Sequence, residues 1–477
     1  MNSARLTIWD DAACRRVHEA TLEVLADTGI EVRYGPAVDV FAKAGAEVEG
    51  TRVRIPATLI DSAIKSAPRD WTLKPRGGDT EPLVLDAHHS YCGTGSDVLY
   101  VRDPDTRERR RARKADVEGM AALCEKLPHI DFVMSMGLPE DVPQAIDDLA
   151  QVDAMVRGTR KPLLVATRDG HVLGRLKEMA ALAGEADSFG IYAMPVPPLL
   201  IDEDGASKVI ACAELDIPLI WAPAPNAGTT APASIASVIV VANAEVLAGL
   251  VLSQAVKPGA PFVWGVGAGA MNMRTMNEVY SSAGPVQGYQ AQTDLVRWYD
   301  LPSFSYAAHS DSKTLDEQWG AESAITTVTG LLSRATLLHD VGYLEAGLQS
   351  SYESILLGNE LVGYTKAFMS ELRVDDEALA LDEIKAVGPG GSHLARPYTR
   401  SHFRQIWQSD LFDTTRHDHW QAAGSRTLLD RLRARVAELR SQPRDFQLSD
   451  DVKAGLDRVL AEVEAQRPGP RPRRTAL

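Results

Sequence analysis

Residues 218–267 read PLIWAPAPNAGTTAPASIASVIVVANAEVLAGLVLSQAVKPGAPFVWGVG, and this stretch decides the fold class. It opens on a short apolar run at 218–223, continues through a long apolar segment at 231–255 and closes on a second short run at 261–267. The short runs have the length and composition of buried strands, and the middle segment is long enough for a helix. A strand, a helix and a second strand in this order predict a βαβ unit with parallel strands.

The same alternation recurs along residues 89–343. With the two runs above it gives eight strand candidates, the others being 90–95, 131–137, 162–167, 193–200, 302–309 and 336–343. Helices are predicted between them, among others at 116–127, 146–156 and 315–332. No extended dinucleotide-binding glycine motif accompanies these units, which favours closure into a barrel over an open sheet. The predicted fold class is α/β, a (β/α)8 TIM barrel.

Extensions are predicted on both sides of a barrel at 89–372. Residues 1–88 form an N-terminal extension of helices and short strands packed on the barrel, with a helix at 57–67 between two prolines. A long helix is expected at 349–372. Residues 373–477 form a C-terminal helical extension, whose last ten residues (PGPRPRRTAL) have the composition of a disordered tail.

The composition restricts the class of protein. The 477 residues carry 50 basic against 65 acidic side chains, and the net charge of −15 argues against a nucleic-acid-binding surface. The four cysteines form no C-x-x-C pair, as expected for a reduced intracellular protein. Acidic residues stand where a signal peptide would be apolar, and no window approaches 18 uninterrupted apolar residues. We therefore expect a cytoplasmic protein without a membrane span.

The candidate site follows from the barrel, because TIM-barrel active sites lie at the carboxyl ends of the strands. The predicted strand ends are rich in aromatic residues, carry a few acids and histidines and hold few basic groups. Such a pocket suits a cation, since ammonium groups bind to the faces of aromatic rings. The binding candidates are Tyr91, Trp221, Asn226, Trp264, Tyr343 and Lys313, and the catalytic candidates are His339, Asp311 and Glu345.

Several of these candidates also have a purely structural interpretation. Trp221 and Trp264 could be ordinary barrel packing. A histidine inside an apolar run, such as His339, is more often a hydrogen-bonded core residue than a catalyst. Asp311 could cap the helix that follows it, and Glu345 could open a surface helix.

Three motif-like stretches carry no function in this interpretation. Residues 169–174 spell D-x-H-x-x-G, a cobalamin-binding pattern, but they lie between two barrel strands and lack the continuation of that module. The glycines at 265–269 do not form G-x-G-x-x-G and are interpreted as a strand end where the backbone approaches a ligand. His417 and His419 lack a third ligand, so no metal is assigned.

The sequence resembles the trimethylamine:corrinoid methyltransferase superfamily at several separate blocks. These occur in the family's order: HEATLEVLADTGIEV at 18–32, RVRIPATLIDSAIKSAP at 52–68, VRDPDTRERRRARKAD at 101–116, GTTAPASIASVIVVANAEVLAGLVL at 228–252, DSKTLDEQWGAE at 311–322, LEAGLQSSYESILLGNEL at 344–361 and VGPGGSHLARPYT at 387–399. The resemblance spans nearly the whole chain. It implies a (β/α)8 barrel, in agreement with the strand count.

The resemblance also implies an activity and a partner. It implies methyl transfer from a methylated amine to Co(I) of a corrinoid (cobalamin) presented by a partner protein, with no cofactor bound tightly by this chain. Founding members contain pyrrolysine, whereas this chain has only standard residues, so it resembles the branch that acts on quaternary amines such as glycine betaine. Many relatives have histidine where this chain has Tyr398, which puts a role of that loop in doubt. We also expect a homo-oligomer.

The chemistry assigns a role to each candidate. A quaternary amine leaves as a neutral tertiary amine, so its demethylation needs orientation and a dry pocket rather than a general acid. We expect Tyr91, Trp221, Trp264 and Tyr343 to form an aromatic lining around the methylammonium group. Asp311 and Glu345 are expected to balance its charge. His339 is expected to orient the donor or to face the corrinoid. A donor carboxylate would be held by backbone amides or by Arg274, Lys313 or Asn226.

Three alternatives stay open at this point. The donor could instead be trimethylamine or another methylated amine. A different TIM-barrel lyase or oxidoreductase would need a Schiff-base lysine or a metal triad, for which Lys313 is the near candidate. A non-catalytic barrel that binds a corrinoid protein would have the same partner without turnover.

Overall fold

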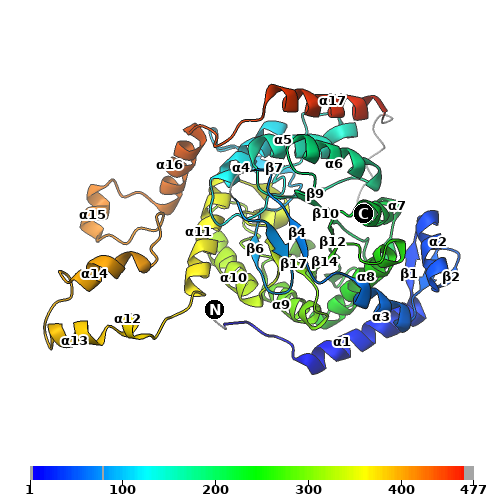
Figure 1. The fold of residues 1–477 in the computed structure, drawn as a ribbon, viewed down its shortest axis with the longest axis horizontal. Coiled ribbons are helices and arrows are strands. Elements are labelled where there is room, and N and C mark those ends of the chain that lie inside the picture. Colours follow the sequence, from blue (N-terminus) through cyan, green and yellow to red (C-terminus); the bar gives the residue numbers. More distant parts are fainter. Residues whose placement is uncertain (1–3, 78–79, 467–477) are drawn as a thin grey trace.

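The computed structural model describes residues 4–77 and 80–466, and its centre is a barrel of parallel strands (Figure 1). Seven strands form one sheet in which each neighbouring pair is parallel. In spatial order they are β6 (Tyr91–Cys92), β18 (Leu337–His339), β17 (Ser303–Tyr306), β14 (Phe262–Gly265), β12 (Leu219–Trp221), β10 (Phe189–Ala193) and β9 (Leu163–Ala166).

The eighth strand position closes the barrel. Residues 132 and 133 occupy it, because single parallel bridges join Phe132 to Gly93 beside β6 and Val133 to Leu163 of β9. The sheet therefore returns to its own first strand, which leaves no open edge among the eight. The predicted (β/α)8 barrel is confirmed.

A ring of helices covers the outside of the barrel (Figure 1). They are α4 (Lys114–Glu125), α5 (Asp147–Gly158), α6 (Leu173–Leu182), α7 (Glu203–Leu215), α8 (Ile235–Val256), α9 (Ala283–Trp298), α10 (Glu317–Ser333) and α11 (Tyr352–Phe368). Four begin after a serine or aspartate whose side chain accepts a hydrogen bond from the first turn: Asp202, Ser234, Asp316 and Ser351. The helices predicted at 116–127, 146–156, 231–255 and 315–332 correspond to α4, α5, α8 and α10.

Helix α8 has no polar face, and most of its residues are buried by the surrounding fold. Its 22 residues could cross a membrane by length and composition, but 72% of its apolar window is buried inside the fold. It packs against α1 (Asp11–Glu23), α3 (Ala57–Ser66) and α7. A helix without a polar face is expected where neighbours enclose it, and α8 is such a core helix.

The predicted fourth strand at 193–200 was wrong. The barrel strand is β10, which precedes most of that segment, and the chain then leaves the barrel so that β11 (Leu200–Ile201) pairs with β1 (Ile30–Val32). Prolines at 195, 197 and 198 lack the N–H that a central strand donates to its neighbour. The buried run FGIYA at 189–193 meets that requirement instead.

The N-terminal extension covers the side and the floor of the barrel. Strands β1, β2 (Glu47–Glu49) and β3 (Arg52–Arg54) form a small sheet with β11, and α2 (Gly35–Ala44) packs beside it on α8. The hairpin of β4 (Trp71–Leu73) and β5 (Leu83–Leu85) places three buried leucines in one cluster with inward-facing barrel residues such as Leu164 and Val263. The hairpin therefore fills the amino-terminal end of the barrel.

Short strands decorate the opposite, carboxyl end. One small sheet consists of β13 (Asn226–Ala227), β15 (Gly269–Asn272) and β16 (Asn277–Val279), and another of β19 (Gln349–Ser350), β7 (Tyr100–Arg102) and β8 (Arg109–Arg111). Both are built from loops that follow barrel strands. These loops carry much of the candidate site.

The C-terminal part first leaves the barrel and then returns to it. The long helix predicted at 349–372 is α11, and beyond it α12 (Asp376–Leu379), α13 (Leu381–Val387), α14 (Pro397–His402) and α15 (His417–Ala422) form an arm that projects from the barrel (Figure 1). Helices α16 (Leu428–Ser441) and α17 (Asp450–Gln466) then pack on α11 and α6. The tail predicted to be disordered at 468–477 lies outside the described residues.

Candidate active site

A cavity of about 230 Å³ opens at the carboxyl ends of the barrel strands. Strands β10, β17 and β18 each contribute a residue from their last two positions, and loops after β6, β12, β14 and β18 supply most of the others. The lining consists of Ser96, Asp97, Tyr192, Met194, Ala224, Gly267, Ala268, Gly269, Glu278, Tyr280, Tyr289, Tyr306, His339, Asp340, Tyr343 and Gly347. Its place is the one where TIM-barrel enzymes bind substrate.

Aromatic rings form a continuous wall of this cavity. The Tyr306 ring lies 4.3 Å from the ring of Tyr289 and 4.6 Å from that of His339, measured between centroids. Tyr280 extends the wall, 6.4 Å from Tyr306, and Tyr192 lies 6.0 Å from His339. Rings at these separations leave π faces and edges toward the cavity, and π faces attract cations.

His309 supports this wall from behind. Its ring meets Tyr280, Tyr289 and Tyr306 edge-on at centroid distances of 6.3, 6.3 and 5.9 Å. Its Nδ1 lies 3.0 Å from the hydroxyl of Ser281. Burial lowers the pKa of His309 to about 4, so the ring is neutral at physiological pH and adds no positive charge behind the tyrosines.

Three carboxyl groups lie among the aromatic residues. They belong to Asp97, Glu278 and Asp340. Burial raises the pKa of Asp97 to about 6, and it also raises the pKa of Glu278, where a hydrogen bond from Asn226 partly opposes the shift and the nearby charge of Asp311 adds to it. Ionised carboxylates with few neighbouring cations favour a positively charged ligand, which would stabilise their charged form.

His339 is held between an aromatic ring and an acid. Its ring stacks on Phe304 with centroids 4.0 Å apart and planes 14° apart. Its Nδ1 lies 2.6 Å from Oδ1 of Asp340, which is an ion-pair distance, yet the angles are not those of a hydrogen bond, and both ring nitrogens have no hydrogen-bond partner among the described residues. The imidazole therefore has a fixed plane and a free nitrogen.

Glycine is required where the chain borders the cavity after β14. A Cβ atom at Gly267 would lie 1.8 Å from the carbonyl oxygen of Pro223, and one at Gly269 would lie 2.1 Å from Oδ1 of Asn226. Contacts of this length do not occur between real atoms, so any larger residue would displace the loop. The close approach seen here is to the chain's own Pro223 and Asn226, and the approach to a ligand that the sequence suggested stays a prediction.

Two of the nine sequence candidates line the cavity. They are His339 at the end of β18 and Tyr343 in the loop after it. The Tyr343 hydroxyl donates a hydrogen bond to the carbonyl oxygen of Ser96, and this bond joins the loops that follow β18 and β6. A Cβ atom at Gly95 would fall 2.1 Å from the Tyr343 ring, so the ring occupies space that only glycine leaves free.

Three further candidates border the cavity without lining it. Asp311 accepts hydrogen bonds from the backbone N–H groups of Tyr280 and Ser281, at 3.1 and 3.2 Å, and so positions the loop that carries Tyr280. Glu345 forms an ion pair with Arg109 at 2.7 Å, which already balances its charge. Asn226 contacts Glu278 from the small sheet above the cavity.

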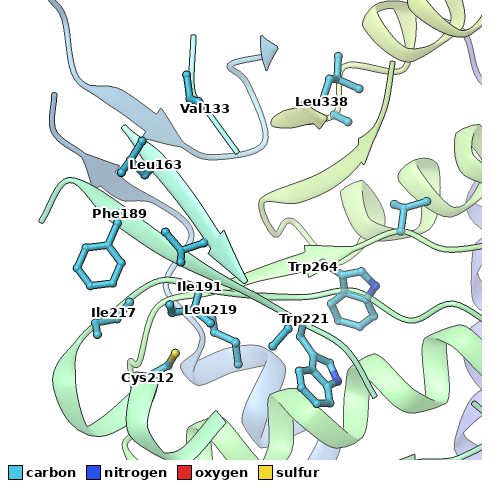
Figure 2. Close-up of a cluster of buried hydrophobic side chains, with 14 of the residues drawn as sticks. Val133, Leu163, Phe189, Ile191, Cys212, Ile217, Leu219, Trp221, Trp264 and Leu338 are labelled. Carbon is cyan, nitrogen blue, oxygen red and sulfur yellow. The ribbon is translucent and has the colours of Figure 1, made fainter. Parts of the chain in front are cut away.

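The two tryptophans belong to a cluster of buried hydrophobic side chains (Figure 2) and do not line the cavity. Successive strand residues point to opposite faces, and in β12 and β14 the residues that join the interior barrel cluster are Ile220 and Val263. Trp221 and Trp264 come next and are fully buried on the outside of the barrel. The indole N–H of Trp221 donates to the Glu245 carbonyl oxygen of α8 at 3.1 Å. We therefore leave both tryptophans out of the site.

The two remaining candidates also lie elsewhere. Tyr91 begins β6 at the opposite end of the barrel, where its hydroxyl accepts a hydrogen bond from the backbone of Val84 in β5. Lys313 is exposed, and its ammonium donates to the backbone carbonyl oxygen of Asp311 at 2.9 Å. Neither reaches the cavity.

The structure shows where two of the motif-like stretches lie, residues 169–174 and the pair His417 and His419. Asp169 accepts a hydrogen bond from the backbone N–H of His171 at 2.9 Å and caps a short turn of helix before α6. His417 and His419 lie exposed on α15 in the projecting arm. Within residues 4–77 and 80–466, no group of three or more His, Cys, Asp or Glu side chains is arranged to hold a metal ion.

The fold and the cavity together define the class of protein. A closed (β/α)8 barrel with an aromatic and acidic cavity at the carboxyl ends of its strands has the architecture of a TIM-barrel enzyme. The model of the trimethylamine methyltransferase (MTTB) family matches residues 1–468. The chain belongs to this family and is a corrinoid-dependent amine methyltransferase.

Similar proteins cover nearly the whole chain. A glycine betaine methyltransferase from Desulfitobacterium hafniense (strain Y51) is 30% identical over 472 residues, which cover 96% of this chain and 97% of the relative. A trimethylamine methyltransferase from strain DCB-2 of that species is 28% identical over 465 residues, covering 96% and 94%. The crystal structure of the Methanosarcina barkeri monomethylamine methyltransferase has the same fold, with 11% identity, a TM-score of 0.52 and coverage of 98% and 89%.

Proposed function

We propose that this enzyme takes a methyl group from a quaternary amine and transfers it to Co(I) of a corrinoid held by a partner protein. The observation that carries the proposal is the cavity itself, in which tyrosine rings and carboxyl groups surround a space suited to a methylated ammonium head. The similarity to a glycine betaine methyltransferase supports a trimethylammonium donor.

The aromatic wall would hold the ammonium head. Its methyl groups would contact the rings of Tyr289 and Tyr306, and its charge would be balanced by Asp97 and Glu278. The cavity lies at the open end of the barrel, because the β4–β5 hairpin fills the other end. One methyl group would point out of this mouth toward the corrinoid, and the fixed plane of His339 would help to set that orientation.

The reaction needs no proton. The electron pair of Co(I) forms the bond to the methyl carbon, the C–N bond breaks, and its electron pair stays on nitrogen as the neutral tertiary amine leaves. The positive charge of the donor disappears during this step. The carboxylates therefore bind the donor more tightly than the product, which favours product release.

The mouth of the cavity offers a surface for the corrinoid partner. Met194 lines the cavity and is also exposed, and Leu348 is exposed next to the lining residue Gly347. Met273 and Met276 are exposed at the turn between β15 and β16, two strands that carry lining residues. Methionines on an exposed rim suit a surface that binds a partner.

The experiment follows methyl transfer by absorbance. The purified protein is mixed with cob(I)alamin or a Co(I) corrinoid protein and with glycine betaine, choline, carnitine, proline betaine or trimethylamine. The Co(I) spectrum is expected to convert to that of methylcobalamin with at least one quaternary donor. No conversion with any quaternary donor in the presence of an active corrinoid protein would contradict the proposal. Conversion with trimethylamine alone would mean that the donor is a tertiary amine instead of a quaternary one.

Acidification is expected to weaken cation binding. The pKa of Asp97 is about 6, so its carboxylate is charged at pH 7.5 and becomes neutral as the pH falls below 6. Protons then compete with the donor, and affinity for tetramethylammonium should fall about tenfold by one pH unit below that pKa. Calorimetric titrations at pH 7.5, 6 and 5 measure this effect, and Asp97→Asn should reduce it to the part that comes from Glu278, whose pKa is also raised. An affinity that is constant over this range in the wild type would contradict the role of Asp97.

We also propose that the chain forms homo-oligomers through its projecting arm. Leu372, Leu394 and Ile406 on this part of the chain are 90%, 83% and 71% exposed, and large apolar side chains gathered on one extension suit a protein interface. Light scattering is expected to give a multiple of the 51.7 kDa chain mass, and Leu394→Glu with Ile406→Glu should shift the wild-type assembly toward monomer. A monomeric wild type would contradict this part.

We also propose that the enzyme is cytoplasmic and that its corrinoid is carried by a separate protein. All four cysteines are free and buried, which agrees with a reducing cytoplasm. The corrinoid would arrive on its own protein rather than stay in this chain, since the cavity of about 230 Å³ is far smaller than a corrinoid ring system would need.

A further inference from the structure

The negative charges that line the cavity are unsuited to the carboxylate of a donor such as glycine betaine. Glycine betaine carries a carboxylate two bonds from its ammonium nitrogen. The sixteen described residues that line the cavity include three with carboxyl groups, Asp97, Glu278 and Asp340, but neither lysine nor arginine. A donor carboxylate would therefore enter a partly buried space that already holds charges of its own sign.

The basic residues that the sequence offered for such a carboxylate lie outside. The Lys313 ammonium is exposed and donates to a backbone carbonyl oxygen. Arg274 is exposed at the tip of the turn between β15 and β16. His339 is the one lining side chain that could gain a positive charge, and Asp340 already lies 2.6 Å from its Nδ1.

Two of the five tyrosine hydroxyl groups at the cavity donate hydrogen bonds within the protein. The Tyr343 hydroxyl donates to the backbone of Ser96, and the Tyr192 hydroxyl donates to the sulfur of Met194 at 3.5 Å. One carboxylate oxygen at the cavity also lacks a partner, although the Asp97 carboxyl is hydrogen-bonded by Gln151. Oδ1 of Asp97 is buried and has no hydrogen-bond partner among the described residues. A buried acceptor without a partner is costly, and a ligand that donates a hydrogen bond removes that cost.

We propose that the donor is a quaternary ammonium compound without a carboxylate, whose tail is uncharged and carries a hydroxyl or another hydrogen-bond donor. This inference rests on the proposed methyl transfer from a quaternary amine and specifies the second end of the donor. The ammonium head lies against the tyrosine rings, and the tail donates to Asp97. Choline is the simplest compound of this class.

The experiment compares donors with identical heads. Choline, glycine betaine and the neutral amide of glycine betaine all carry a trimethylammonium group, and the last two are nearly equal in size. The ratio of kcat/KM for methylation of cob(I)alamin is expected to favour both neutral donors over glycine betaine by at least about 100-fold. Equal or higher kcat/KM with glycine betaine would overturn the inference while leaving the proposed function intact.

Two variants connect the preference to the cavity. Glu278→Gln removes one negative charge and should reduce the preference for choline over glycine betaine at least about tenfold. Arg274→Gln is the matched control, because its side chain lies outside the cavity, and the preference should not change. A preference that depends on Arg274 and not on Glu278 would also overturn the inference.

Binding separates this inference from the proposed function. Calorimetric titration of the whole protein with the same three compounds needs no corrinoid and no turnover. Tighter binding of the two neutral compounds is expected even if none of them transfers its methyl group, an outcome that would contradict the proposed function alone. Tighter binding of glycine betaine would overturn the inference alone.

Discussion

Changing Glu278 to glutamine is expected to raise KM for a quaternary donor about 100-fold and to leave kcat unchanged or higher. Loss of one partner from a desolvated charge pair weakens binding by about this factor. The donor loses its positive charge as the methyl group departs, so the carboxylate stabilises the bound donor more than the transition state. Initial rates of cob(I)alamin methylation over a range of donor concentrations measure both constants.

A surface acid provides the control for this variant. Glu317 begins α10 and is exposed to solvent, so Glu317→Gln changes the net charge equally and should leave KM within about twofold because exposed charges are screened. A lower kcat at unchanged KM in Glu278→Gln would mean that Glu278 acts on the transferring methyl group rather than on the cation.

Changing Trp264 to alanine is expected to lower the free energy of unfolding by ~3–5 kcal/mol. Its ring is fully buried and stacks on Tyr299 with centroids 4.9 Å apart, between the barrel and its helices. Removal leaves a cavity that rigid neighbours cannot fill. Urea denaturation followed by circular dichroism measures the loss.

A second variant separates packing from a role in the site. Trp264→Phe keeps a ring in the same space and should lose less than half as much stability as the alanine variant. Both variants should retain the wild-type KM at temperatures where they are folded. An unchanged unfolding midpoint combined with lost methyl transfer would return Trp264 to the active site.

The barrel could be predicted from the sequence because its strands are short apolar runs separated by helices of ordinary length. The exception was β10, where a proline-rich neighbour at 193–200 resembled a strand by its aliphatic content. Hydrogen-bonding capacity decided between the two segments, since proline has no N–H to donate. The run at 189–193 contains no proline and can donate every backbone N–H that a central strand needs.

The direction of strand side chains could not be predicted in the same way. Parallel barrel strands are buried on both faces, so they lack the alternation of polar and apolar residues that reveals the inner face. Trp221 and Trp264 occupied strand ends as expected, but their side chains point outward. Tyr306 and Tyr192 lie at equivalent ends and point inward.

The remaining residues that line the cavity differ in whether the sequence alone could have predicted them. Asp97 and Asp340 follow barrel strands closely, so the rule that found His339 would also have found them. Tyr289 lies on helix α9, and Tyr280 and Glu278 lie on or beside a hairpin above the barrel. Only the tertiary fold brings these residues to the cavity, and no local pattern marks them.

A crystal structure of the protein with tetramethylammonium would show whether the cavity binds a quaternary ammonium head. This cation has the head of a quaternary donor and no tail, and it cannot be confused with water at high resolution. We expect electron density for the cation in the cavity against the rings of Tyr289 and Tyr306, with Asp97 and Glu278 as the nearest charges. Density for the cation elsewhere, with no cation in the tyrosine-lined cavity, would contradict the assignment of this cavity as the donor site.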